Sequence, residues 1–291
     1  MRGGCETNRG GTRVGVATAS ETDAVARLRA ATAFVFDMDG VLYRGSLPLP
    51  GVAELLDALA LRGRGVMLAT NNSTATAASY VAKLAKMGIV VAEDAILTSA
   101  LATRDYLRQT LPAGSGVFVV GSPALREQLF TDSDFYPVQY GEEQPAAVVV
   151  GMDTGFDYAK LSAAMVAIRG GARFIATNTD ATLPIETGFV PGAGSIVAAV
   201  ATASGRDPLV IGKPETPMLE MALARLRASP AQAVMIGDRL ETDILAGARA
   251  GMTTVLVLTG ASTRDEIASA PARPDLVAND LPALTSALIG G

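Results

Sequence analysis

The sequence predicts an α/β protein in which a parallel sheet is covered by helices on both faces. Short apolar runs lack the alternation of a half-exposed strand, and Ala-rich segments with helical periodicity separate them. We expect strands at 33–36, 66–69, 117–120, 147–150, 173–176, 209–211, 233–236 and 254–258. We expect helices at 51–62, 75–87, 100–109, 157–169, 193–204, 216–227 and 241–250, with Ser99 as the N-cap of the third.

The length and composition indicate a large folded protein. The chain has 291 residues, which exceeds a typical domain of roughly 100–200 residues, so we expect two domains or one domain with a large insertion. Hydrophobic residues make up 49% and charged residues 18%, which excludes an intrinsically disordered chain. We expect residues 1–25 to form a flexible leader, whose first 20 residues lack the apolar segment of a secretory signal.

The charge and the residue types exclude several classes of function. The net charge of −5 argues against a nucleic-acid partner, which would need a basic surface. No apolar run approaches the roughly 18 residues that span a membrane. The single cysteine, Cys5, has no partner for an intrachain disulfide, so we expect a cytoplasmic protein. The chain has no histidine, which excludes Ser-His-Asp and Cys-His catalysis and leaves acid–base work to carboxylates.

Polar residues follow four of the expected strands, at the end where an open parallel sheet binds its ligands. They are Asp37-Met38-Asp39-Gly40, Thr70-Asn71-Asn72-Ser73, Gly212-Lys213-Pro214 and Gly237-Asp238-Arg239-Leu240-Glu241-Thr242-Asp243. We expect these four segments to meet at one edge of one sheet. Their side chains together would hold a divalent cation and a phosphate.

Asp37 and Asp39 are the expected reactive carboxylates. They are two residues apart, so in an extended segment both side chains point the same way. When a cation shields its charge, Asp37 can attack phosphorus as a nucleophile. Asp39 can protonate the leaving oxygen and then deprotonate the water that cleaves the aspartyl-phosphate. The sequence therefore predicts a phosphatase in which Asp37, Asp39, Thr70 and Lys213 are catalytic.

The same segments supply ligands for a metal and for phosphate. Mg²⁺ prefers six oxygens and keeps several waters, so it needs only a few protein ligands. We expect these to be Asp37, the Asp39 backbone carbonyl and Asp238, with Asp243 bound through a water. The residues expected to bind phosphate are Asp39, Gly40, Thr70, Asn71, Asn72 and Lys213. Lys213 would also offset negative charge in the transition state.

Several residues allow a second interpretation. Thr70 could cap a helix, and Asp243 could complement a helix dipole instead of binding metal. Arg239 could reach a substrate or lie in solvent. Asn178 and Asp180 could contact substrate or form a turn.

Taken in order, the four segments resemble the motifs of the haloacid dehalogenase superfamily. The finer pattern is similar to its NagD-like branch, subfamily IIA, which includes p-nitrophenyl phosphatases and phosphoglycolate phosphatases. That branch has a Thr-Asn-Asn second motif, a Gly-Lys-Pro third motif and a Gly-Asp-x-x-x-Thr-Asp-Ile fourth motif, which stand here at 70–72, 212–214 and 237–244. The resemblance covers about residues 32–258.

The resemblance implies a Rossmann-like, doubly wound parallel-sheet core with an inserted α/β cap of the C2 type. We expect the core at 26–112 and 208–291 and the cap at 113–207, because the segment between Thr70 and Lys213 is long enough to hold it. A cap that closes over the substrate excludes water and brings specificity residues to the site. Similar proteins dimerise through the cap, so a homodimer is a further expectation.

Three other activities would use related residues. A phosphotransferase or mutase keeps the Asp37 nucleophile and changes the acceptor. Haloacid dehalogenation needs no metal and would leave Asp39 and Asp238 as unfavourable charge beside Asp37. A non-catalytic phosphate-binding module, such as a receiver domain, is much shorter than this chain. The substrate stays open among small phosphorylated metabolites: phosphoglycolate, glycerol phosphate, a sugar phosphate, a nucleotide or pyridoxal phosphate.

Overall fold

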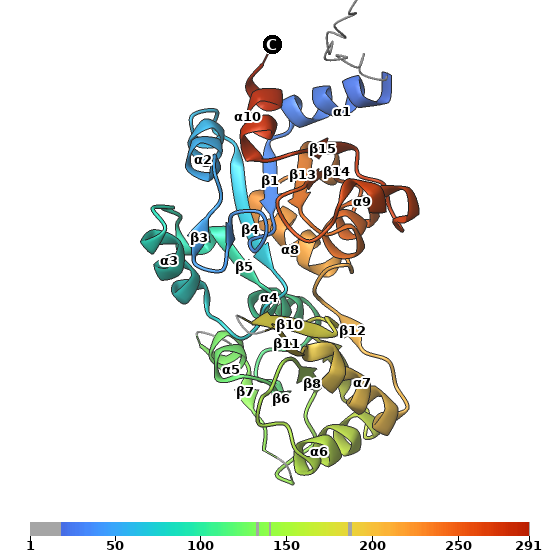
Figure 1. Ribbon diagram of the computed structural model, residues 1–291. Helices are drawn as coiled ribbons and strands as arrows, with labels where there is room; N and C mark the ends of the chain where they lie inside the picture. Colours follow the sequence, from blue (N-terminus) through green and yellow to red (C-terminus); the bar gives the residue numbers. More distant parts are fainter. Residues whose placement is uncertain (1–18, 132–133, 140, 186–187, 291) are drawn as a thin grey trace, which may run out of the picture.

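The computed structural model describes residues 19–131, 134–139, 141–185 and 188–290. Two parallel sheets, each with its own helices, lie one above the other in Figure 1, and a hairpin of β10 (Thr182–Ile185) and β11 (Gly188–Pro191) lies between them. All strands of the lower unit in that view come from the chain between β5 and β13. The predicted α/β fold, a doubly wound parallel sheet with a second α/β unit inserted in it, is confirmed.

The larger sheet has six parallel strands in the order β15-β14-β13-β1-β4-β5. Its strands are β1 (Ala33–Phe36), β4 (Gly65–Thr70), β5 (Ile96–Thr98), β13 (Ala233–Gly237), β14 (Thr253–Val257) and β15 (Leu276–Ala278). Parallel neighbours need crossover connections, which are usually helical. The helices of this unit are α1 (Ala19–Ala30), α2 (Val52–Ala60), α3 (Ala77–Lys86), α4 (Ser99–Thr110), α8 (Pro217–Leu226), α9 (Leu245–Arg249) and α10 (Leu281–Ile289).

Both faces of this sheet are buried, which explains why its strands read as continuous apolar runs. Along β1, Phe34 and Phe36 join one apolar cluster, whereas Ala33 and Val35 join another on the opposite face. The alternation is therefore present in space although it is hidden in the hydropathy of the sequence.

The smaller sheet has five parallel strands in the order β12-β9-β8-β6-β7. Its strands are β6 (Gly116–Val120), β7 (Tyr136–Pro137), β8 (Ala147–Val150), β9 (Arg173–Ala176) and β12 (Leu209–Val210), and its helices are α5 (Pro123–Phe130), α6 (Tyr158–Arg169) and α7 (Ala193–Ser204). One face packs through Val148, Phe174 and Val197. On the other face, Val119 belongs to the same apolar cluster as Val35 of β1, so a continuous core joins the two sheets.

Short segments complete the described chain. A hairpin of β2 (Tyr43–Arg44) and β3 (Leu47–Pro48) follows β1 closely. The 3₁₀ turns are η1 (Glu93–Ala95), η2 (Pro230–Gln232) and η4 (Arg264–Ser269), and a π-helical turn, η3 (Leu240–Ile244), leads into α9. Across the described ranges, no helix has the length and apolar character needed to cross a membrane.

The structure corrects the expectation that four strand ends belong to one sheet. The strand before Lys213, β12, pairs with β9 of the smaller sheet. Val210 packs against the apolar cluster of that sheet, which draws the strand there. Three of the expected segments therefore come from the larger sheet and the Lys213 segment comes from the smaller one. The boundaries 26–112, 113–207 and 208–291 stay predictions.

Two local predictions are also corrected. The N-cap of α4 is Thr98, whose side chain accepts a hydrogen bond from the Leu101 N–H, and Ser99 is the first helical residue. Residues 1–18 of the expected leader lie outside the described residues. Residues 19–25 are helical, because α1 buries Ala24 and Leu28 in the apolar cluster of the larger sheet.

Candidate active site

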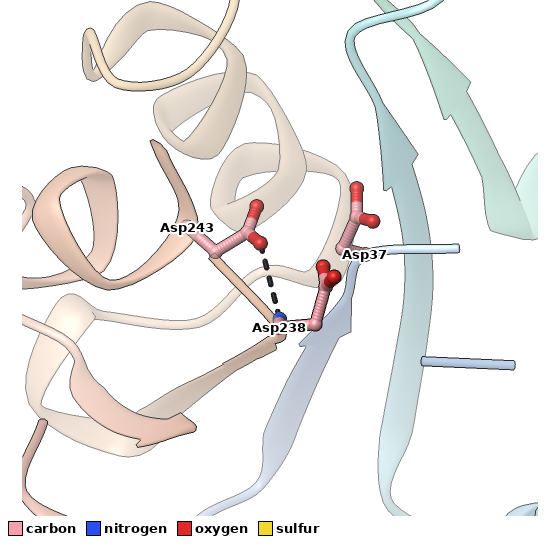
Figure 2. A group of neighbouring side chains, drawn as sticks. All are labelled: Asp37, Asp238 and Asp243. Carbon is pink, nitrogen blue, oxygen red and sulfur yellow. Dashed lines mark hydrogen bonds between the residues drawn. The ribbon is translucent and has the colours of Figure 1, made fainter. Parts of the chain in front are cut away.

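Two neighbouring strands of the larger sheet bring Asp37 and Asp238 together. In the parallel register Phe36 pairs with Ile236, so the residues that follow β1 and β13 leave the sheet side by side. The Asp37 N–H donates to the Ile236 carbonyl at 2.9 Å and continues the ladder by one residue. Figure 2 shows the two carboxylates at these adjacent strand ends.

Asp243 adds a third carboxylate from the π-helical turn η3. Its Oδ2 accepts hydrogen bonds from the N–H groups of Asp238 at 3.2 Å, the dashed line in Figure 2, and of Arg239 at 3.1 Å. The turn is tight: a Cβ on Gly237 would lie 2.1 Å from the Asp243 Cβ, so only glycine fits there. Asp37, Asp238 and Asp243 each place one oxygen within 4.8 Å of the others.

Lys213 enters this cluster from the smaller sheet and is 2% exposed. Its Nζ lies 2.5 Å from Asp37 Oδ1 and 2.8 Å from Asp243 Oδ1, and it donates to the Ala69 carbonyl at 3.1 Å. All three ammonium hydrogens therefore have an acceptor. Burial alone would lower the pKa of Lys213, but Asp243 and Asp37 outweigh it and hold the pKa above its ordinary value. The lysine is a fixed positive charge.

The cluster holds more negative charge than one lysine balances. Burial raises the pKa of Asp37 above its usual range, Lys213 counteracts this in part, and Asp243 and Asp238 raise it further. Burial and the Asp243 charge likewise raise the pKa of Asp238, against the hydrogen bond from the Ala261 N–H. A divalent cation between these carboxylates would favour their charged forms.

Asp238 has the features of a metal ligand. Its Oδ2 accepts the Ala261 N–H at 2.6 Å, while its Oδ1 is buried and has no hydrogen-bond partner among the described residues. A buried carboxylate oxygen without a partner is costly unless something binds it. Gly40, at φ +82°, and Gly260 crowd this carboxylate: a Cβ would lie 2.4 Å and 1.9 Å from its Oδ2. The residues present fit a hard cation such as Mg²⁺, which prefers carboxylate oxygens.

Asp39 lies apart from this cluster. Met38 is fully buried between Asp37 and Asp39, and both aspartates line the same cavity. Partial burial raises the pKa of Asp39, and the positive charges of Lys83, Arg239 and Arg44 counteract the rise. The expected role of the Asp39 carboxylate in proton transfer and the expected metal contact of its backbone carbonyl both stay predictions.

The segment at the end of β4, residues 70–72, agrees with only part of what was predicted for it. Thr70 is nearly buried, and its hydroxyl accepts the Asn72 N–H at 3.2 Å. The alternative that Thr70 caps a helix is wrong, because Thr76 caps α3. The Asn72 carboxamide oxygen accepts both the N–H and the hydroxyl of Thr74, which shapes the turn. The expected contacts of Thr70, Asn72 and Gly40 with phosphate stay predictions.

The Asn71 carboxamide is already occupied by protein partners. Its Oδ1 accepts the Lys213 N–H at 2.9 Å, and its Nδ2 donates to the Lys213 carbonyl at 2.8 Å and to the Asp180 carboxylate at 3.2 Å. A contact of Asn71 with phosphate is therefore left to its backbone N–H. Asp243 is similar, since both of its oxygens have partners and a metal contact through water remains a prediction.

A cavity of about 690 Å³ lies over these residues. Every residue predicted for the site lines it, together with side chains that the sequence reasoning had left out or left open: Arg44, Tyr80, Lys83, Met152, Asn178, Asp180, Leu183, Phe189 and Arg239. The sequence held a signal for Lys83. It lies three residues after Tyr80 on α3, so Tyr80 and Lys83 are on the same face of the helix, and both side chains line the cavity.

The chain is similar to several known proteins. The sequence matches the family model described as haloacid dehalogenase-like hydrolase over residues 34–133, and the one described as HAD-hydrolase-like over residues 210–284. It is 37% identical to an acid sugar phosphatase of Staphylococcus epidermidis over 86% of this chain and 95% of the relative.

Two solved structures are similar along most of the chain. One is NagD from Escherichia coli K-12, with 34% identity, a TM-score of 0.80, and coverage of 87% of this chain and 97% of NagD. The other is a glycerol phosphate phosphatase from Mycobacterium tuberculosis in complex with magnesium, with 34% identity and a TM-score of 0.80. That match covers 89% of this chain and 77% of the other chain.

Proposed function

Because the chain belongs to the haloacid dehalogenase-like hydrolases and its relatives are NagD-like, we propose that it is a Mg²⁺-dependent phosphatase that forms an aspartyl-phosphate on Asp37. The relatives are named as phosphatases, so this chain is a hydrolase that acts on phosphate esters. The metal dependence, the covalent step and the residue roles are the parts that the proposal adds.

One observation carries the proposal: Asp37 lies in the cavity with a fixed cation, Lys213, and with Asp238, whose buried Oδ1 accepts no hydrogen bond from the residues that the structure describes. Lys213 favours the charged form of Asp37, which is the form that attacks phosphorus. Asp37, Asp238 and the Asp39 carbonyl would hold Mg²⁺, with Asp243 reaching it through water. When bound, Mg²⁺ offsets the charge of the phosphate and of the carboxylate that approaches it.

The steps follow from the placement of the chain's own groups. A carboxylate oxygen of Asp37 forms a bond to phosphorus while the bond from phosphorus to the leaving oxygen breaks. Asp39 gives its proton to that oxygen, which a raised pKa favours. A water then attacks the aspartyl-phosphate, Asp39 takes the water's proton, and the Asp37 carboxylate is released. Throughout, the Lys213 ammonium offsets the charge that gathers on the phosphoryl group.

With Mg²⁺ bound, the charges around the cavity would favour a phosphate dianion as substrate. Its described lining contains five aspartates and four cationic side chains: Asp37, Asp39, Asp180, Asp238, Asp243, Arg44, Lys83, Lys213 and Arg239. Counted with every carboxylate in its charged form, this lining has a net charge of −1, which repels a dianion, whereas one bound Mg²⁺ would reverse the sign. A cavity of about 690 Å³ is of the size that holds small ligands. We therefore propose a small phosphorylated metabolite with an uncharged leaving group, such as a glycerol or sugar phosphate.

The competing activities differ in what they require. Haloacid dehalogenation would leave the partnerless Asp238 oxygen without a use, so the structure favours phosphate chemistry. A phosphotransferase shares every group described here and is tested by adding alcohol or sugar acceptors. The homodimer through the cap and the cytoplasmic location stay predictions.

The proposal is tested with p-nitrophenyl phosphate and Mg²⁺. We expect Asp37→Asn to lower kcat by at least about 10³-fold, because an amide is a poor nucleophile. Asp57→Asn, the same change at an exposed position of α2, is the matched control and retains wild-type kcat. A folded Asp37→Asn variant with wild-type activity would exclude Asp37 as the nucleophile.

A further inference from the structure

The side chain of Lys213 contacts Asp37 of the larger unit, whereas its backbone continues from a strand of the smaller unit. The Ile211 N–H donates to the Ala176 carbonyl and the Gly212 N–H donates to the Thr177 carbonyl, both at 2.9 Å, so the chain stays paired with the β9 segment up to residue 212. One residue later the side chain reaches Asp37, which follows β1 of the larger sheet. The position of the ammonium therefore depends on how the two units are joined.

The Asn71 carboxamide connects the Lys213 backbone to the larger unit. Its oxygen accepts the Lys213 N–H and its nitrogen donates to the Lys213 carbonyl, as a neighbouring strand would do. The approach is close: a Cβ on Gly212 would lie 2.6 Å from Asn71 Oδ1 and 2.7 Å from the Thr177 carbonyl oxygen. Asn71 follows β4 directly, so it fixes the Lys213 backbone to the larger sheet.

The smaller unit holds the same carboxamide from the other side. The Asn71 Nδ2 also lies 3.3 Å and 3.2 Å from the two carboxylate oxygens of Asp180. Asn178 donates to the Asn71 carbonyl at 2.8 Å and accepts the Asp180 N–H at 3.1 Å. The backbone of Asp180 is held as well, because its carbonyl accepts the Gly194 N–H at the start of α7. Residues that follow β4, β9 and β12 thus meet at Asn71.

We propose that Asn71 and Asp180 are positioning residues that keep the Lys213 ammonium in contact with Asp37. Asp180 accepts a hydrogen bond from the Asn71 carboxamide and so fixes its orientation relative to the smaller unit. The inference rests on the proposed role of Lys213 in the phosphatase reaction. Both backbone groups of Lys213 are held by one side chain, so losing that side chain releases the backbone. A displacement of about 1 Å in a catalytic group can lower the rate by about 100-fold.

The first test removes the carboxamide without changing any charge. In the full-length protein with p-nitrophenyl phosphate and Mg²⁺, we expect Asn71→Ala to lower kcat by about 10- to 100-fold with KM changed by less than about threefold. A residue that only stabilised the fold would lower the Tm and the folded fraction but leave the kcat of the folded molecules. Wild-type kcat in folded Asn71→Ala would overturn the inference.

The second test exchanges the two partners. Asn71→Asp keeps the shape but sets a carboxylate against the Lys213 carbonyl and against Asp180, so we expect a loss of at least about 10-fold in kcat. In Asn71→Asp with Asp180→Asn, the new amide at position 180 can donate to the carboxylate at position 71. We expect this double variant to recover at least about fivefold of kcat relative to Asn71→Asp, although Asp180→Asn alone lowers kcat slightly.

The controls separate this inference from its alternatives. Asp180→Asn does not rescue Asn71→Ala, because no carboxylate is there to receive its N–H group. Asn279→Asp, the same charge change at an exposed and distant residue, retains wild-type kcat. If Asp37→Asn is inactive but the two changes at 71 and 180 are additive, this inference fails and the proposed function stands. If Asp37→Asn is active, the proposed function itself fails.

Discussion

The two parallel sheets place different kinds of residue after their strands. In the larger sheet, β1 and β13 are followed by Asp37 and Asp238, whose pKa values burial raises. In the smaller sheet, β9 is followed by Thr177 and Asn178, and β12 leads to Lys213. The larger sheet brings together two carboxylates that repel each other, and the smaller sheet adds the lysine that offsets part of their charge.

The difference means that the charge balance at Asp37 depends on a residue that follows a strand of the other sheet. Lys213, whose ammonium contacts Asp37, arrives from the smaller sheet and favours the charged form of that carboxylate. The continuous apolar cluster that contains Val35 of β1 and Val119 of β6 gives the two units a common support. The predictions below test one group at a time: first a carboxylate of the larger sheet, then the bound cation, and last a residue of the β10–β11 hairpin.

Among the changes considered next, the largest effect is expected from Asp238→Asn. The amide oxygen can keep the hydrogen bond from the Ala261 N–H, and the NH₂ group then replaces the oxygen for which the described part of the chain supplies no partner. Because an NH₂ group does not ligate Mg²⁺, we expect the Mg²⁺ affinity to fall by at least about 100-fold. The measurement is a Mg²⁺ titration of phosphatase activity and of binding by calorimetry.

A matched change tests whether the position of this charge matters. Glu241→Gln removes one negative charge from the same loop, but Glu241 is exposed and does not line the cavity. We expect its Mg²⁺ affinity to stay within about twofold of the wild type, as for most surface substitutions. Equal losses in both variants would mean that the loop attracts the cation only through its net charge.

The larger sheet was the easier part to predict from sequence, for a physical reason. Each of its central strands is apolar on both faces, so a polar residue such as Asp37 or Asp238 directly after the run stands out. The parallel register then brings these strand ends together without any further information. The same reasoning placed Lys213 beside Asp37 correctly but assigned its strand to the wrong sheet, because a two-residue strand carries no signal for the sheet that it joins.

A smaller and pH-dependent effect is expected from Mg²⁺ on thermal stability. In the metal-free protein, burial raises the pKa of Asp37 to about 8, so the stability associated with its neutral form is present at low pH. This contribution is lost as the pH rises from about 4, the pKa in the unfolded chain, to about 8. Mg²⁺ favours the charged form, so we expect the rise in Tm with MgCl₂ to be larger at pH 8 than at pH 5.5.

This experiment has its own scale and control. A ligand at 100 times its Kd stabilises the folded state by about 2.7 kcal/mol, which is a Tm shift of several degrees for a protein of this size. Thermal melts with and without MgCl₂ at both pH values give the comparison, and Asp238→Asn should show a much smaller shift. A Tm increase that is the same at pH 5.5 and pH 8 would contradict the assignment of the ion to these carboxylates.

The surroundings of the site were harder to predict than its reactive groups. Arg44 lies in a two-residue strand, and Phe189 lies in a short hairpin that is not part of either main sheet. Such segments are too short for a periodic pattern, and their position over the cavity depends on how the two units pack. The sequence shows Lys83 and Asn71, but it does not show that the charge of Lys83 acts on Asp39 or that the Asn71 carboxamide accepts the Lys213 N–H.

The smallest effect is expected at the edge of the cavity that the hairpin provides. Phe189 of β11 is 72% exposed, yet it lines the cavity together with Leu183 and Met152. An exposed aromatic ring at the mouth of a site gains apolar contact when a substrate covers it. We expect Phe189→Ala to raise KM for p-nitrophenyl phosphate by about three- to tenfold, about 1 kcal/mol, with kcat within twofold. For glycerol phosphate, whose leaving group has no ring, KM should change less.

Leu61→Ala, at an 87% exposed position outside the cavity, is the control. If Phe189→Ala instead lowered kcat equally for both substrates, the hairpin would influence the reacting groups. The reacting groups would then depend on the hairpin as well as on the segments that follow the strands of the two main sheets.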